Sequence, residues 1–299
     1  MTENTHTGTD MDTDTGTGTG TGTGMGPVLV TAATGKTGRR VAERLAARRV
    51  TVRAGSRNGG SGTDGGTLFD WDTPETWGPA LRGADAAYVA YYPDLAAPGA
   101  VAAMGTFARL ALRHGVRRVV LLSGRGEPQA VRAEEALAVP GLEVTVVRAA
   151  FFAQNFTEGA MADGVAAGEV PFPAGSTAEP FIDADDVADV VVAALTEDGH
   201  AGLVHELTGP RLLTFDEVAA ELGRAAGREV RYVPVTREEY AGMLRAYGIP
   251  EAMAAWVAEL FAALLDGHNA SLTDGVKRVL GREPRDFAAF AKDAVTPVR

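Results

Sequence analysis

The chain has 299 residues, no cysteine and a formal net charge of −11. The lack of cysteine excludes disulfides, thiolate catalysis and cysteine-based metal centres. The acidic balance gives no electrostatic footprint for nucleic acid. The five histidines lack ligand-like spacing, so no metal site is predicted. No apolar run approaches the roughly 20 residues that span a bilayer, and no secretory signal is visible. We therefore expect a cytoplasmic protein that binds neither nucleic acid nor membrane.

The first 26 residues are dominated by threonine, glycine and aspartate and have no apolar face to bury. Such a segment cannot offset the entropy that is lost when a chain becomes ordered. We therefore expect a disordered tail over 1–26 and a fold that begins at residue 27.

A short apolar strand at 28–31 is followed by a turn of small residues and by a helix that opens at Gly38. The pattern is A-x-x-G-x-x-G, with Ala32 in place of the usual first glycine. Such a turn predicts a dinucleotide site, because a helix N-terminus presents free N–H groups to a pyrophosphate. The alternative is a structural turn with an emptied site. The predicted cofactor-binding residues of this turn are Thr31, Ala33, Thr34, Gly35, Lys36, Thr37 and Gly38.

Strand and helix patterns alternate through the first half of the chain. Strands are predicted at 50–54, 67–69, 86–91, 119–122 and 144–147, and helices at 74–81, 101–114 and 129–139. Several of these strands are apolar on both faces, which is typical of a parallel sheet covered by helices on both sides. The predicted fold class is α/β, with a doubly wound, Rossmann-type parallel sheet whose dinucleotide-binding domain covers 27–156.

The second half of the chain has a looser pattern. A helix is predicted at 185–195, strands at 204–207 and 230–234, and further helices at about 251–265 and 286–292. Thr214 with Glu217 and Thr236 with Glu239 form two capping boxes, each of which opens a helix. We therefore predict that 157–299 holds the remaining sheet elements and a smaller, mixed C-terminal substrate lobe.

The order of these pieces resembles the NmrA-like family of atypical short-chain dehydrogenase/reductases. Within it, the chain is most similar to bacterial members that resemble ergot-alkaloid iminium reductases and NADPH:quinone reductases. The resemblance covers about 27–295 and includes Arg53 and Arg57. Its other motifs are T-A-A-T-G-K-T-G at 31–38, F-D-W-D at 69–72, L-L-S-G-R at 121–125, F-F-A-Q-N-F at 151–156, F-I-D-A-D-D-V at 181–187 and E-L-T-G-P at 206–210. The resemblance implies either an NADP-dependent reductase or a non-catalytic redox sensor.

Residues 50–63 contain no acid that could hold the 2′-hydroxyl of NAD, and Arg57 stands where a 2′-phosphate is expected. A guanidinium can bind that phosphate bidentately, so we predict NADP(H) in preference to NAD(H). The alternative is that Arg53 and Arg57 are solvated arginines at a strand end. The family resemblance implies that Asp70 and Trp71 border the adenine, with a solvated loop as the alternative.

No tyrosine has a lysine four residues further on, so the usual Tyr–Lys proton relay is missing. A substrate that needs little acid assistance is expected, such as a quinone, an iminium ion or an enone. Ser123, Tyr91 and Tyr92 end predicted strands and are the candidate catalytic residues. Ser123 is also placed beside the cofactor. Each of the three has a purely structural alternative.

A group of aromatic and amide side chains follows the sixth strand, where the resemblance implies the substrate pocket. The predicted pocket residues are Phe151, Phe152, Gln154, Asn155, Phe156 and Trp256. The alternative is that the phenylalanines simply join the two lobes and that Trp256 belongs to the core.

These features predict an NADPH-dependent reductase of a small conjugated or aromatic acceptor, acting as a monomer or homodimer. The alternative is a non-catalytic NADP(H)-binding sensor that acts through a protein partner.

Overall fold

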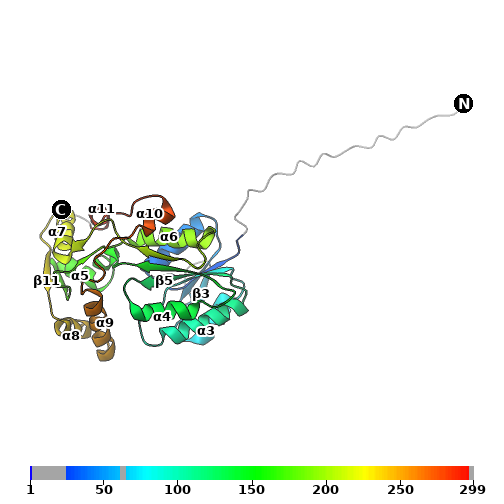
Figure 1. Cartoon of the computed structure of the whole chain (residues 1–299), viewed down its shortest axis with the longest axis horizontal. Helices are drawn as coiled ribbons and strands as arrows, with labels where there is room; N and C mark the ends of the chain where they lie inside the picture. The colour runs from blue at the N-terminus through cyan, green and yellow to red at the C-terminus, as the bar shows by residue number, and fades with distance from the viewer. Residues whose placement is uncertain (2–24, 61–64, 296–299) are drawn as a thin grey trace.

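The computed structural model describes Met1, residues 25–60 and residues 65–295 (Figure 1). Apart from Met1, Met25 and Gly26, the tail predicted over 1–26 lies outside the described residues.

A parallel sheet of seven strands forms the centre of the molecule, in the order β3-β2-β1-β4-β5-β6-β9. Its strands are β1 (Val28–Val30), β2 (Val52–Ser56), β3 (Gly66–Leu68), β4 (Ala86–Val89), β5 (Arg118–Gly124), β6 (Glu143–Ala149) and β9 (Val204–Leu207). Every pairing between them is parallel, with Val28 opposite both Val52 and Ala86. Strands β2 and β3 are added on one side of β1, and β4, β5 and β6 on the other. The direction of strand addition therefore reverses at β1, which leaves a crevice at the carboxyl ends of β1 and β4. The predicted doubly wound sheet is confirmed.

Helices cover both faces of this sheet. The covering helices are α1 (Lys36–Ala47), α2 (Trp77–Leu81), α3 (Ala100–Arg113), α4 (Pro128–Leu137), α6 (Ala184–Thr196) and α10 (Gly275–Leu280). In Figure 1, α3 and α4 lie on one side of the sheet and α6 lies on the other. Side chains alternate along a strand, so Val28 and Val30 pack in the α1 and α6 core while Leu29 packs in the α3 and α4 core. All three are fully buried.

The second lobe lies beside the sheet and has an aromatic core of its own. Phe156, Phe172, Phe181 and Phe215 are almost completely buried there. Its elements are η2 (Ala153–Phe156), α5 (Ala160–Ala167), β7 (Glu169–Phe172), β8 (Ala178–Glu179), β10 (Leu213–Thr214), α7 (Phe215–Ala226), β11 (Arg231–Pro234), α8 (Arg237–Ala246), α9 (Glu251–Leu264) and α11 (Phe287–Ala294).

Both capping boxes of the second lobe are confirmed, at Thr214 and at Thr236. The structure also contains α5 and β7, which the sequence pattern did not predict. The α5 segment consists largely of small apolar residues without an amphipathic stripe, and β7 pairs with β11 from distant sequence. The predicted helix 74–81 is instead a 3₁₀ turn, Pro74–Thr76, followed by α2.

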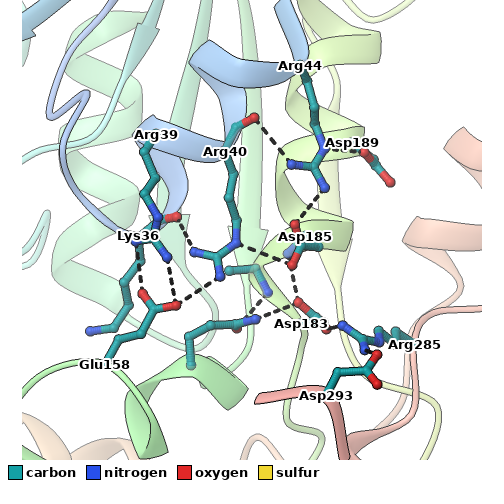
Figure 2. Close-up of polar contacts among 12 residues, drawn as sticks. Lys36, Arg39, Arg40, Arg44, Glu158, Asp183, Asp185, Asp189, Arg285 and Asp293 are labelled. Carbon is teal, nitrogen blue, oxygen red and sulfur yellow. Dashed lines mark hydrogen bonds and ion pairs between the residues drawn. The ribbon is translucent and has the colours of Figure 1, made fainter. Parts of the chain in front are cut away.

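Arginines on α1 connect the helix to the second half of the chain (Figure 2). Arg39 and Arg40 both donate to Glu158, at 2.8 and 2.9 Å, and Arg44 donates to Asp185 and Asp189 on α6. These ion pairs are only partly buried, and pairs near the surface typically contribute about 1 kcal/mol or less each, so these contacts serve mainly to fix the direction of α1.

Within the described part of the chain, no helix combines the length and apolar character needed to cross a membrane.

The turn after β1 holds a strained residue, because Ala32 has a positive φ of 49°. This conformation costs an L-residue about 1–2 kcal/mol, whereas glycine adopts it freely. We predict that Ala32→Gly raises the free energy of unfolding by about 0.5–1 kcal/mol, measured by urea denaturation. The matched control is Ala33→Gly, at a buried residue without positive φ, which should lose about 1 kcal/mol. Equal losses for both variants would contradict this account of the turn.

Candidate functional site

The turn between β1 and α1 presents an open anion-binding surface. Gly35 is the N-cap of α1 and provides no side-chain cap, so the N–H groups of the first helical turn are free to bind a ligand. A Cβ built on Gly38 would overlap the carbonyl oxygen of Ala32, so only glycine allows α1 to start this close to β1. Free N–H groups and a positive helix end suit a pyrophosphate. The residues present therefore fit a dinucleotide.

Two of the three threonines predicted to bind the cofactor have hydroxyl groups that are held inside the protein. The Thr31 hydroxyl accepts a hydrogen bond from the Ala90 N–H at 2.9 Å, and the Thr37 hydroxyl accepts one from the Tyr88 hydroxyl at 2.8 Å. Both threonines are buried, so their side chains support the turn from behind. Ala33 is also buried and donates its N–H to Gly55, while Thr34 is exposed on the outer side.

Lys36 extends from the start of α1 into a neighbouring cavity. Burial lowers the pKa of its ammonium group, and the nearby Glu158 carboxylate partly offsets that effect. Figure 2 shows Lys36 beside Arg39, Arg40 and Glu158.

The two arginines near the end of β2 have different surroundings. Arg53 turns back and donates to the carbonyl oxygens of Ala80 and Arg82, which anchors the C-terminal end of α2. Arg57 is exposed and its guanidinium stands over the Tyr92 ring, 5.3 Å from the centroid. Of the two arginines, Arg57 is therefore the one whose guanidinium is exposed beyond the end of β2.

Trp71 supports the wall of the cavity from behind. Its indole N–H donates to the Ala90 carbonyl at 3.0 Å, and its ring packs against Tyr91 with centroids 5.0 Å apart. Asp70 is tied into its own loop, since its side chain accepts the Asp72 N–H and its carbonyl accepts the Trp77 indole N–H.

A cavity of about 330 Å³ opens at the carboxyl ends of β4, β5 and β6 and is closed from the second lobe by α9. Ligands of open α/β sheets bind at this edge. Its walls combine aromatic, aliphatic and acidic side chains. The lining includes Lys36, Tyr91, Leu95, Leu122, Ser123, Phe151, Phe152, Asn155, Leu260, Phe261, Asp94, Glu127 and Glu179.

Only part of the predicted pocket set lines this cavity. Phe151, Phe152 and Asn155 do, whereas Gln154, Phe156 and Trp256 lie elsewhere. Gln154 faces the interior, where it donates to Asp183 at 2.6 Å and accepts the Ala184 N–H. Phe156 belongs to the aromatic core of the second lobe. On α9 it is Leu260 and Phe261, about one turn beyond Trp256, that reach the cavity.

The three candidate catalytic residues are separated by the structure. Tyr91 and Ser123 line the cavity, but Tyr92 is 60% exposed and lies outside it beneath Arg57. Burial raises the pKa of Tyr91, which makes it a weaker acid. Ser123 donates its hydroxyl proton to Glu134 at 2.6 Å, and Glu134 in turn is paired with Arg148.

Three acidic residues of the cavity were not predicted from the sequence. Asp94 follows β4, Glu127 follows β5 and Glu179 lies on β8. Burial raises the pKa of all three, with that of Glu179 at about 7. The sequence signal that could have found Glu127 is the G-R-G-E-P turn at 124–128, which directly follows a buried strand.

The sheet, the open start of α1 and the adjoining cavity define an NAD(P)-binding oxidoreductase. A family model described as NAD(P)H-binding matches residues 32–198, and the model of the NmrA-like family matches residues 128–290. The chain belongs to the NmrA-like family, as the resemblance predicted.

Characterised relatives include oxidoreductases. The NAD(P)H azoreductase of Xenophilus azovorans is 34% identical, with 89% of this chain and 96% of that protein covered. Agroclavine dehydrogenase of Claviceps fusiformis is 32% identical, with the same shares covered.

Solved structures share the fold. Citrobacter sp. triphenylmethane reductase complexed with NADP(H) aligns with a TM-score of 0.69 at 20% identity, covering 90% of this chain and all of that one. NmrA, a negative transcriptional regulator solved in complex with NAD, aligns with a TM-score of 0.67 at 21% identity, covering 90% and 95%.

Gly35 allows a test of the anion-binding turn. A Cβ there would lie 3.1 Å from the Ala32 carbonyl oxygen, and its φ of −79° suits any residue. We predict that Gly35→Val folds but loses dinucleotide affinity by at least about 100-fold in calorimetric titration, because its branches block the approach of the pyrophosphate. Gly38→Ala is the contrasting variant, which should lose stability as well. Dinucleotide binding by Gly35→Val at the affinity of the unaltered protein would refute the assignment.

Glu179 makes stability depend on pH. Its pKa is raised to about 7 from an ordinary 4.5, so the folded state binds the proton more tightly and stability falls as pH rises from about 4.5 to 7. We predict that Glu179→Gln removes this loss. Between pH 5 and pH 8, the free energy of unfolding of the variant should increase relative to that of the unaltered protein by an amount on the order of 1–2 kcal/mol.

The control for this prediction has the opposite sign. The Glu217 carboxylate caps α7 and its pKa is lowered by the Thr214 N–H, so Glu217→Gln should cost more stability at pH 8 than at pH 4. A Glu179→Gln curve parallel to that of the unaltered protein would contradict the first prediction.

Proposed function

We propose that the protein is an NADPH-dependent reductase that transfers hydride to a small conjugated or aromatic acceptor, such as a quinone, an iminium ion or an enone, without a Tyr–Lys relay. The observation that carries this proposal is the cavity at the carboxyl ends of β4, β5 and β6, directly beside the open start of α1. A bound reduced nicotinamide would supply the hydride.

The residues of the chain have separate tasks in this proposal. The backbone N–H groups of the first turn of α1, which follow Gly35, bind the pyrophosphate, while Thr31, Thr37 and Gly38 hold the turn in place. Phe151, Phe152 and Phe261 provide flat apolar walls that position a planar acceptor, and Asn155 offers a polar contact. Enclosure between the sheet and α9 excludes water and orients the reactants.

The preference for NADP(H) rests on Arg57. It is exposed at the rim beyond β2, and its ordering against the Tyr92 ring leaves the guanidinium free for a 2′-phosphate. No acid between residues 50 and 63 competes for a ribose hydroxyl.

A non-catalytic sensor is the second candidate function. It is favoured by the fold shared with NmrA, a negative transcriptional regulator. A sensor has no need for an enclosed acceptor cavity beside the nicotinamide position, which favours the reductase.

The proposed function is tested by the loss of NADPH absorbance, with NADH in parallel, against a panel of quinones, cyclic iminium ions and enones. Turnover with at least one class is expected. Tight NADPH binding without turnover on the whole panel would instead support the sensor.

Arg57 allows a test of the cofactor preference. We predict that Arg57→Ala weakens NADPH binding about 10–100-fold, because a charge-assisted contact to phosphate is lost, and leaves NADH binding unchanged. The matched control is Arg53→Ala, which loses its contacts to α2 and should reduce stability without changing the NADPH/NADH ratio. An equal loss for both cofactors in Arg57→Ala would show that Arg57 does not read the phosphate.

A further inference from the structure

Glu127 is a buried acid whose carboxyl group packs against the end of β5, where a glycine leaves room for it. Its side chain is 7% exposed, and it lines the cavity. A Cβ at Gly124 would overlap Oε1 of Glu127, so the glycine is needed for the carboxyl group to lie against the strand end. Although Glu127 is the N-cap residue of α4, its side chain does not cap that helix. The carboxyl group is therefore turned away from the helix and toward the cavity.

Among the residues that the structure describes, the carboxyl group of Glu127 has no cationic or N–H partner. Its Oε2 is buried and makes no hydrogen bond in the described part of the chain, where Glu127 also forms no ion pair. A second acid, Asp94, lines the same cavity after the neighbouring strand β4, and the two carboxyl groups influence each other's pKa. A buried carboxyl group and a partly buried one that lie near each other cannot both be charged at low cost, so the pair retains a proton.

The charged groups around the pair do not remove this proton. Glu134 on α4 adds a further negative charge, which raises the pKa of Glu127 together with burial and Asp94. Arg125 is occupied by the Asn269 carbonyl, Ser271 and Glu206.

Lys36, Glu179 and His268, at or beside the cavity, each lie near a group of opposite charge, unlike Glu127. Lys36 lies near Glu158, Glu179 faces Arg125 and His268, and His268 is held by Asp266 and the Gly126 carbonyl. Tyr91 is a weakened acid.

We propose that Glu127, paired with Asp94, is the proton donor of this site and that the cavity accepts a neutral conjugated carbonyl compound such as a quinone. This inference rests on the proposed reductase function. Hydride adds to the acceptor, and the O–H bond of the Glu127 carboxyl breaks as its proton moves to the acceptor oxygen that gains the electron pair. The carboxylate that remains regains a proton from water through Asp94, which is only partly buried. One hydride and one proton reduce the quinone to a hydroquinone.

The first test uses the cofactor-free protein and Glu127→Gln, with Glu221→Gln as the matched control. Glu221 is also a buried acid with an unpartnered oxygen, but it lies on α7 and pairs with Arg211. Glu179 would itself be partly protonated at pH 7, because its pKa is about 7, so the spectra are recorded in a Glu179→Gln background. Infrared spectra at pH 7 should show the carbonyl band of a protonated carboxyl group in this Glu179→Gln parent and when Glu221→Gln is added to it. The band should be absent when Glu127→Gln is added instead. A band that persists with Glu127→Gln, or that is missing from the Glu179→Gln parent, would overturn the proposal.

The second test compares menadione, a neutral quinone, with malachite green, a cationic dye whose charge is neutralised by hydride alone. For menadione, Glu127→Gln should lower kcat at least about 100-fold and abolish the fall of kcat at alkaline pH. Asp94→Asn should move that fall to lower pH, because Glu127 loses its acidic neighbour. For malachite green, kcat should stay within about 3-fold, since no proton is required.

The outcomes of the second test separate the two proposals. Equal losses on both acceptors, or an unchanged pH profile with menadione, would overturn the role of Glu127. If the unaltered protein reduces neither these acceptors nor the wider panel, the proposed function fails, and the role of Glu127 as its proton donor fails with it. The infrared band then reports only whether the pair holds a proton.

Discussion

The close approach of α1 to the turn after β1 is the constraint on which the rest of the site depends. A side chain at Gly38 would overlap the Ala32 carbonyl, and Ala32 itself adopts a positive φ so that the turn can close. This geometry aims the uncapped start of α1 at the crevice beside β4. The arginines of α1 are then held by Glu158 of the second lobe and by the acids of α6 on the same face of the sheet, so the helix proposed to bind the dinucleotide is tied to both (Figure 2).

The missing Tyr–Lys pair and the buried acids of the cavity both concern the source of the proton in the proposed reduction. The sequence leaves no tyrosine with a lysine at the required spacing, and in the structure Ser123 is committed to Glu134. The sequence therefore led us to expect an acceptor that needs little assistance from an acid. Burial against Asp94 gives Glu127 a raised pKa, and a carboxyl group that is still protonated at neutral pH can serve where a tyrosine is absent. In the proposed reaction, the cofactor supplies the hydride and Glu127, in the wall of the cavity, supplies the proton.

Patterns that are local in sequence predicted the fold well. The Thr214 and Thr236 capping boxes and the apolar strand predicted at 28–31 each depend on residues within a few positions. The structure contains both boxes, and the strand spans Val28–Val30. Contacts across the sheet were less visible. Asp94 and Glu127 line the same cavity because β4 and β5 are neighbours, which no periodicity reveals. A 3₁₀ turn sends Gln154 inward and Asn155 to the cavity, although the two amides are adjacent.

The most direct measurement is a crystal structure of the protein with oxidised NADP and menadione bound together. The account predicts the pyrophosphate at the N-terminus of α1, the 2′-phosphate beside Arg57, and a quinone oxygen within hydrogen-bonding distance of Glu127. A dinucleotide bound away from this turn, or a quinone whose oxygens face solvent or other side chains while Glu127 remains paired only with Asp94, would contradict it.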